Sequence, residues 1–263
     1  MARQRERFER TDVPRDNPHQ NLIATIVVVV VFVVCGIVVS TAWSRAQAQS
    51  HLGDSKLSSS VSRTPSVSDL GYTVSSDTFM GVLLLTTDNL DASASGGANL
   101  SSAELLVYDE TAATGKLVSI PTDVKVSYNG QDTTLAELFS ASGAAACVSP
   151  LSTAANLPVT HVIVSTSAVW DEVRSLAGVG VNSLIGRATE FLSSIRTDMS
   201  SQEILDLAEK VQSAGTDGLS KVDAPMVDEA TTDESGNSVS TGYRVIDQAS
   251  LGLAVGTLVS NEG

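Results

Sequence analysis

Hydrophobic and polar positions divide the chain into an apolar run, a polar stretch and a long patterned region. No residue from Leu22 to Trp43 is charged. At about 1.5 Å per helical residue, this run can cross a hydrocarbon core of about 30 Å, which predicts a transmembrane helix over 22–43. Residues 44–76 are rich in serine and lack apolar periodicity, which predicts a flexible stalk. Residues 77–263 are then left to fold.

Short β-type runs alternate with helical patterns in this last region. We expect strands at residues 79–85, 104–108, 117–120, 124–128, 159–164 and 243–246. A polar, acidic stretch at 228–242 is typical of a surface loop. A closing helix is expected from about residue 247 to 258.

Three further helices are predicted between these strands, at residues 167–178, 184–195 and 201–213. The third has the clearest signal, because Ser200 and Glu203 form an S-x-x-E capping box before it. Strands interleaved with helices predict a layered α/β domain, with a central mixed β-sheet flanked by helices.

The distribution of charge predicts how the chain sits in a membrane. Five arginines precede the apolar run, so the positive-inside rule makes residues 1–21 a short cytoplasmic tail. The helix would be a single-pass signal anchor in the cell membrane, and the domain after it would be extracytoplasmic. The alternative is a signal peptide cleaved after Ala48, since residues 46–48 have the small-x-small form. Either outcome exports the domain.

Composition narrows the classes of function. Residues 46–263 hold 10 Lys and Arg against 26 Asp and Glu, a formal charge of −16, which argues against nucleic-acid binding. Cys35 lies in the apolar run and Cys147 in the folded part, so no disulfide is expected between them. The small apolar neighbours of Cys147 indicate a buried hydrophobe, and the alternative is a reactive thiol.

Motifs of metal, phosphate-loop and nucleophile-elbow chemistry are absent from the sequence, and no metal site is predicted. His161 stands alone on a predicted strand, where a hydrogen-bonded structural histidine is expected rather than a catalytic base. Asp88 and Asp123 each follow a predicted strand. A carboxylate there is either a turn residue or a ligand for a metal or a substrate hydroxyl.

Three segments together resemble motifs of one family. Leu84 to Leu90 resembles an L-L-G-x-D-x-R strand, Ser101 to Val107 an R-S-D-T-x-M-L-V strand, and Ser119 to Asp123 the signature S-I-P-R-D. The order is similar to that of the LytR-CpsA-Psr family. These are membrane-anchored extracytoplasmic α/β proteins that transfer cell-wall glycopolymers from a polyprenyl pyrophosphate carrier onto peptidoglycan.

Three later segments follow the same family order, at residues 157–164, 173–181 and 196–208. The first resembles a strand containing a histidine, the second a helix and turn ending in G-G-V, and the third a helix preceded by T-d-l-s. The resemblance therefore covers most of residues 79–259.

The departures from the family motifs concern charge. Leu90, Leu100 and Thr122 stand where the resemblance expects arginines, and Ser102 stands where it expects an acid. A pyrophosphate is recognised by bidentate guanidinium groups, which also stabilise charge in the transition state. The site that the resemblance implies has therefore lost its cations.

A family stretch rich in arginine is also missing after Val181, and Arg187 is the one remnant or else an exposed helix residue. Asp88, Asp123 and Arg187 are thus candidates for a vestigial ligand or Mg²⁺ site. No catalytic residue is assigned.

The sequence therefore favours a divergent, non-catalytic family member with a binding or accessory role in cell-wall biogenesis, and no cofactor. The resemblance implies that its partners are the membrane, through residues 22–43, and a polyprenyl-linked glycopolymer or peptidoglycan.

Two alternatives stay open. An active phosphotransferase would hold Mg²⁺ on Asp88 or Asp123, with Arg174, Arg187 or Arg196 supplying the cradle. An unrelated extracytoplasmic interaction domain would match the motifs by chance, and it would lack a central sheet carrying both aspartates at neighbouring strand ends.

Overall fold

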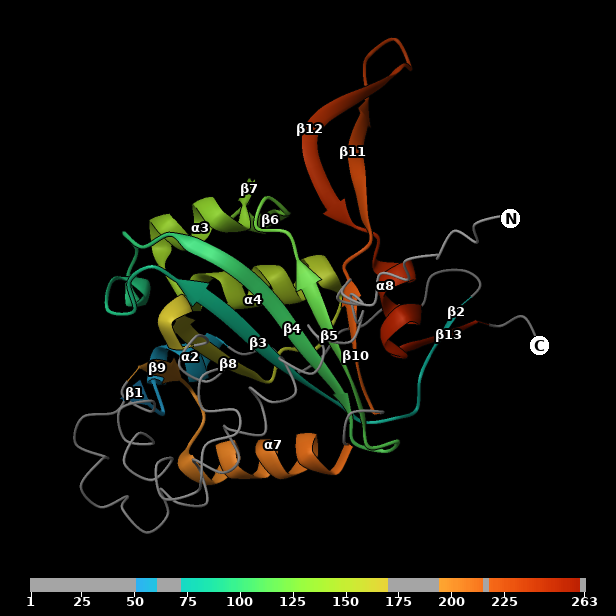
Figure 1. Cartoon of the computed structure of the whole chain (residues 1–263). Helices are drawn as coiled ribbons and strands as arrows, with labels where there is room; N and C mark the ends of the chain where they lie inside the picture. Colours follow the sequence, from blue (N-terminus) through green and yellow to red (C-terminus); the bar gives the residue numbers. More distant parts are fainter. Residues whose placement is uncertain (1–50, 61–71, 170–193, 215–217, 261–263) are drawn as a thin grey trace, which may run out of the picture.

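A seven-stranded mixed sheet is the centre of the computed structural model, which describes residues 51–60, 72–169, 194–214 and 218–260. Its strand order is β1-β9-β8-β3-β4-β5-β10 (Figure 1). The strands are β1 (His51–Leu52), β3 (Phe79–Thr87), β4 (Leu100–Asp109), β5 (Thr114–Ile120), β8 (His161–Thr166), β9 (Ile195–Thr197) and β10 (Leu219–Asp223). The predicted α/β class with a central mixed sheet flanked by helices is confirmed.

Strand β3 lies between β4, to which it is antiparallel, and β8, to which it is parallel. Its sequence is an almost continuous apolar run because both of its faces are buried. Backbones approach closely at Gly81, where a Cβ atom would overlap the carbonyl oxygen of Pro158. Only glycine therefore fits at this point of β3.

Helices cover both faces of the sheet (Figure 1). They are α2 (Ser55–Ser60), α3 (Leu135–Ser142), α4 (Ala144–Ala155), α7 (Ser201–Ala214) and α8 (Gln248–Val255), with a 3-10 turn η1 (Ala92–Ala94). The main core joins α2, α3 and α4 to alternate sheet residues such as Leu85 and Leu105. Helix α7 covers the opposite face, where the Tyr108 hydroxyl donates to the Lys210 carbonyl.

Three small antiparallel sheets complete the described structure. They pair β6 (Lys125–Tyr128) with β7 (Gln131–Thr134), β13 (Leu258–Ser260) with β2 (Tyr72–Val74), and β11 (Met226–Thr232) with β12 (Ser238–Ile246). The β11–β12 pair, called the ribbon below, projects from the body of the domain (Figure 1).

The predicted strands at 79–85, 104–108, 117–120, 124–128, 159–164 and 243–246 are confirmed, with shifted ends. The predicted surface loop at 228–242 is wrong, because this segment forms most of the ribbon. The strands of the ribbon are largely exposed on both faces, so they carry no alternation of apolar and polar residues that a sequence pattern could reveal.

The predicted flexible stalk is wrong for residues 51–60. Strand β1 pairs with β9, and helix α2 buries Leu57 to 2% exposure in the main core. One leucine in a serine-rich helix of six residues gives no periodic signal, although its burial ties this segment to the domain. The stalk is also wrong for Tyr72–Val74, which form β2 and pair with β13. Residues 44–50 and 61–71 of the predicted stalk lie outside the described residues.

The helix predicted at 201–213 is confirmed, including the capping box between Ser200 and Glu203. The closing helix ends earlier than predicted, at Val255, and Leu258 begins strand β13. Ile195 belongs to strand β9 rather than to the predicted helix at 184–195. Most of that helix, and most of the one at 167–178, falls outside the described residues.

Within the described part of the chain, no helix is long and apolar enough to cross a membrane. The predicted span at 22–43 lies outside that part, so the anchor stays a prediction.

Candidate functional site

The two aspartates singled out from the sequence lie at one edge of the central sheet. Strands β3 and β5 are both antiparallel to β4, so their carboxyl ends meet at the same edge. Leu85, Ala103 and Ile120 form one row across these strands, and each aspartate follows three residues beyond that row. Neighbouring strands are about 4.8 Å apart, so the ends of β3 and β5 are separated by roughly 10 Å.

Asp88 is bonded to the beginning of the neighbouring strand. Its Oδ1 accepts from the Asn99 backbone N–H at 2.8 Å, and its Oδ2 accepts from the Asn99 side-chain amide at 2.6 Å. These two bonds lower the pKa of Asp88. Both carboxylate oxygens are thus engaged in closing the β3–β4 connection, although the side chain is exposed at the surface.

Asp123 has a different partner, which comes from the ribbon. Arg244 Nη1 lies 3.5 Å from Asp123 Oδ2, and both side chains are about half exposed. An isolated bridge between Val124 and Arg244 brings β12 to this turn. Sequence reasoning missed Arg244, because its distance of 121 residues from Asp123 leaves no local signal.

The positions where the resemblance expects arginines hold side chains that belong to the domain's interior or turns. Leu100 is buried in the main core, and Leu90 packs against that core. Thr122 is partly buried in the turn before Asp123, and Ser102 is exposed on β4. Apolar packing therefore replaces charge at two of the three positions.

Arg196 is engaged elsewhere in the sheet. Its Nη1 lies 2.7 Å from Asp54 Oδ2, and both side chains are 13% exposed. Burial alone would raise the pKa of Asp54, but the hydrogen bond and charge of Arg196 lower it. This pair fastens α2 and β1 to β9, with β8 standing between β9 and β3. Arg174 and Arg187 lie outside the described residues.

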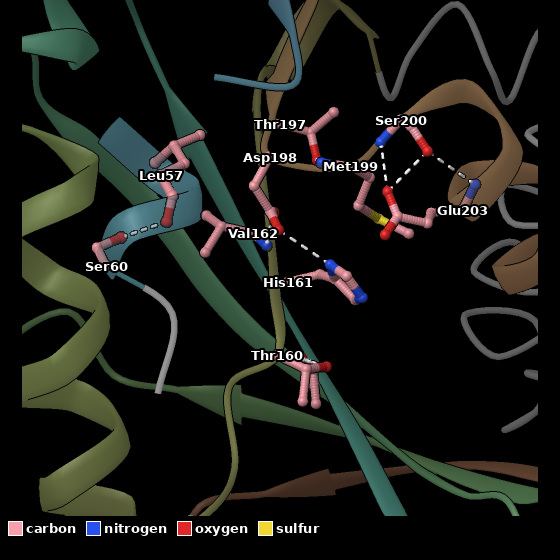
Figure 2. Close-up of polar contacts among 11 residues, drawn as sticks. Leu57, Ser60, Thr160, His161, Val162, Thr197, Asp198, Met199, Ser200 and Glu203 are labelled. Carbon is pink, nitrogen blue, oxygen red and sulfur yellow. Dashed lines mark hydrogen bonds and ion pairs between the residues drawn. The ribbon is translucent and has the colours of Figure 1, made fainter. Parts of the chain in front are cut away.

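A second polar cluster joins β8, β9 and α7 (Figure 2). The His161 Nδ1 atom lies 2.9 Å from Asp198 Oδ2, and Asp198 Oδ1 accepts the Val162 N–H at 2.7 Å. The predicted hydrogen bonding of His161 is confirmed. A carboxylate-oriented imidazole resembles part of a catalytic triad, but the Ser200 hydroxyl donates to Glu203 instead. The cluster therefore holds β8 to the segment that follows β9.

A groove of about 920 Å³ lies between α2, α4, the β6–β7 hairpin and the base of the ribbon. Neither Asp88 nor Asp123 lines it. Its wall holds Lys125, whose ammonium lies 2.8 Å from Asp132 and 2.6 Å from Glu229. These carboxylates raise the pKa of Lys125, so its ammonium stays protonated and its positive charge is already balanced by its two neighbours.

The described residues contain no group of three or more His, Cys, Asp or Glu side chains placed to hold a metal ion. Cys147 is fully buried, as predicted, and burial raises the pKa of its thiol to about 12. A thiol held neutral in this way is a poor nucleophile, which disfavours the reactive alternative.

No protein-family model and no curated protein matches the chain. Solved structures do, among them the transcriptional regulator yvhJ from Bacillus subtilis, at 15% identity and a TM-score of 0.47, covering 67% of this chain and 94% of that one. TagT from B. subtilis matches at 16% identity and 0.44, covering 74% and 95%. TagT bound to LI-WTA matches at 15% and 0.45, covering 68% and 88%.

These structures are LytR-CpsA-Psr family proteins, the family that the sequence motifs resemble. Identities this low, with TM-scores below 0.5, say nothing about what this chain does.

Proposed function

We propose that this chain is a divergent LytR-CpsA-Psr protein of the cell envelope, with a binding or accessory role in wall biogenesis and without glycopolymer transfer. The order of the motifs along the chain supports the family. The central sheet supports it too, because the aspartates of the first and third motifs lie at one edge of it, although β3 and β5 are separated by β4 and are not the neighbours that were expected. The unrelated-domain alternative predicted no such sheet.

The proposed loss of transfer rests on two observations. Leu90 and Leu100 pack in or against the core where the family motifs would place cations, and Asp88 is committed to Asn99. Truncating a buried, hydrogen-bonded charge commonly costs about 2 to 5 kcal/mol of binding free energy. Several such losses leave little affinity for a pyrophosphate.

Binding of the carrier tests this proposal. The full-length chain in detergent is titrated with a polyprenyl pyrophosphate and Mg²⁺ by isothermal calorimetry, and we expect no saturable binding. The full chain is needed, because a fragment beginning at residue 76 would lack Leu57, which is part of the core. Tight, saturable binding would contradict the proposed loss.

A gain-of-charge variant makes the test sharper. Thr122→Arg returns the guanidinium that the S-I-P-R-D signature expects, and one charge-assisted contact should strengthen carrier binding about tenfold. The variant should therefore give measurable binding heat at protein concentrations where the unmodified chain gives none. Ser213→Arg adds the same charge at an exposed position on α7 and should change nothing. Equal effects of the two variants would show that the sheet edge has no special relation to the carrier.

The position of Arg244 gives the transferase alternative a specific form. A guanidinium beside Asp123 is the one pairing of this kind among the described residues at the sheet edge. With peptidoglycan as acceptor, an active enzyme would form a phosphodiester between an acceptor hydroxyl and the glycopolymer phosphate, break the pyrophosphate bond and release polyprenyl phosphate, and Arg244→Gln would abolish this release. We expect the unmodified chain to release none.

A further inference from the structure

The ribbon is fastened to the domain only near its base, as far as the described residues show. Lys125 pairs with Glu229, the Tyr243 hydroxyl donates to the Asp132 carbonyl, and Arg244 pairs with Asp123. Among the described residues, the hydrogen bonds of residues 230–240 stay within the ribbon and the turn that connects its two strands. Two strands alone are marginally stable in water, so a ribbon held out in this way is poorly supported by its own contacts.

Strand β11 has an open edge. In the described part of the structure it pairs with β12 alone, and the irregular register puts the extra residues on β12. Strand β11 contains neither lysine nor proline, two of the devices that block edge pairing, although it carries Asp228 and Glu229 and its register with β12 shifts between Asp228 and Ala230. An edge that pairs with no other described strand can accept one.

The two faces of the ribbon differ in character. Residues opposite each other in an antiparallel pair share a face, so Val227 lies with Val245 and Thr231 with Val239. Val227 and Val239 are 47% and 45% exposed. By the same alternation, Glu229 lies on the face of Val227 and Thr231, and its carboxylate is paired with Lys125. The other face carries Asp228, opposite Arg244, and Thr232. A strand added to β11 would thus meet valine, threonine and a carboxylate already paired with Lys125 on one face, and the carboxylate of Asp228 on the other.

Charge selects the kind of partner. Asp228 and Glu234 have no ion-pair partner among the described residues, and the domain carries a formal charge of −16 over residues 46–263. A second copy of this chain would bring the same negative charge to the edge. A basic segment gains from the same field.

We propose that β11 binds an extended segment of a partner protein as a third strand, and that this segment alternates β-branched apolar residues with Lys or Arg. Main-chain hydrogen bonds provide the affinity, and the alternation provides the specificity. This inference goes beyond the proposed envelope role and does not depend on whether the sheet edge binds a carrier.

A synthetic peptide tests the proposal. A fluorescein-labelled Lys-Val octapeptide is titrated into the full-length chain at low salt, and anisotropy is measured against a Glu-Val octapeptide and a Lys-Val peptide interrupted by proline. We expect saturable binding of the regular Lys-Val peptide alone. Equal binding of the interrupted peptide would overturn the proposal, because charge without strand pairing would then suffice.

Hydrogen exchange locates the complex. Half of the β11 amides point away from β12, and we expect these to gain protection when the Lys-Val peptide binds. Protection elsewhere, without β11, overturns the proposal. Protection that appears with rising protein concentration and no peptide would instead identify a second copy as the occupant.

Two matched variants complete the test. Asp228→Asn should weaken peptide binding about two- to fivefold, the range expected for one exposed ion pair, while Glu209→Gln on α7 should have no effect. Equal weakening by both variants would mean that only net charge matters, which overturns the proposed site.

Discussion

Single residues decide what each carboxylate of this domain can do. Asp88 and Asp123 both follow a strand, and the sequence predicted that much. The sequence could not show that Asn99 would donate hydrogen bonds to Asp88, or that Arg244 would pair with Asp123. Both contacts depend on how the strands are paired. The positions of candidate groups were thus predictable here, whereas their availability was not.

The thiol of Cys147 should be unreactive in the folded protein. It is buried, and the raised pKa keeps it neutral at physiological pH. In a Cys35→Ser background, we expect no labelling by iodoacetamide at pH 8 until denaturant unfolds the domain. Mass spectrometry measures the label, and rapid modification of the native protein would contradict the burial.

Asp198 should matter for stability rather than chemistry. It is 6% exposed and accepts from both His161 and the Val162 backbone, so Asp198→Ala leaves buried donors unpaired. We expect a loss of about 1 to 3 kcal/mol in the free energy of unfolding, measured in urea. Asp206→Ala removes an exposed carboxylate on α7 and is the control. Its free energy of unfolding should stay within about 0.5 kcal/mol of that of the unmodified chain.

At the scale of elements, α2 is the segment whose role differs most from its sequence. Leu57 is its one buried side chain, and Asp54 before it pairs with Arg196. Leu57→Ala should lower the free energy of unfolding by about 2 to 5 kcal/mol. Leu253→Ala on α8, where the leucine is 39% exposed, is the matched control and should cost much less. A loss for Leu57→Ala as small as that of the control would place α2 outside the folded unit.

Elements buried on a face were predictable, and exposed or short ones were not. The apolar run of β3 and the helical spacing of apolar residues in α7 predicted these two elements, because burial imposes those patterns. The ribbon and α2 lack them. The ribbon is defined by pairing between distant residues such as Met226 and Ile246, and α2 by the burial of a single side chain in the core.

For the whole molecule, acid should be destabilising. Hydrogen bonds and paired cations lower the pKa of eight carboxylates in the folded state, outweighing burial where it opposes them. They are Asp54, Asp88, Asp132, Glu137, Glu203, Glu229, Asp233 and Asp247. Their unfolded values are 3.8 for Asp and 4.5 for Glu. Their stabilisation is present above those values and is lost as the pH falls through the folded ones.

We therefore expect the urea midpoint of unfolding to fall between about pH 5 and about pH 3, followed by circular dichroism. Relief of repulsion among the excess acids acts in the opposite direction. Glu137→Gln removes one of the shifted groups, so it should lower the midpoint at neutral pH and flatten the acid-induced drop. A midpoint that rises on acidification would show that repulsion, not pairing, dominates.

The pairing of β1 with β9 also sets an order of events in time. His51 aligns with Arg196, so the first strand of the domain waits for a partner made about 145 residues later. A chain synthesised from its N-terminus can form the β3–β4 hairpin early, but it cannot lock β1 until nearly three quarters of its length has emerged. The end of the domain nearest the predicted anchor therefore settles late, although β2, which waits for β13, depends on a still later partner.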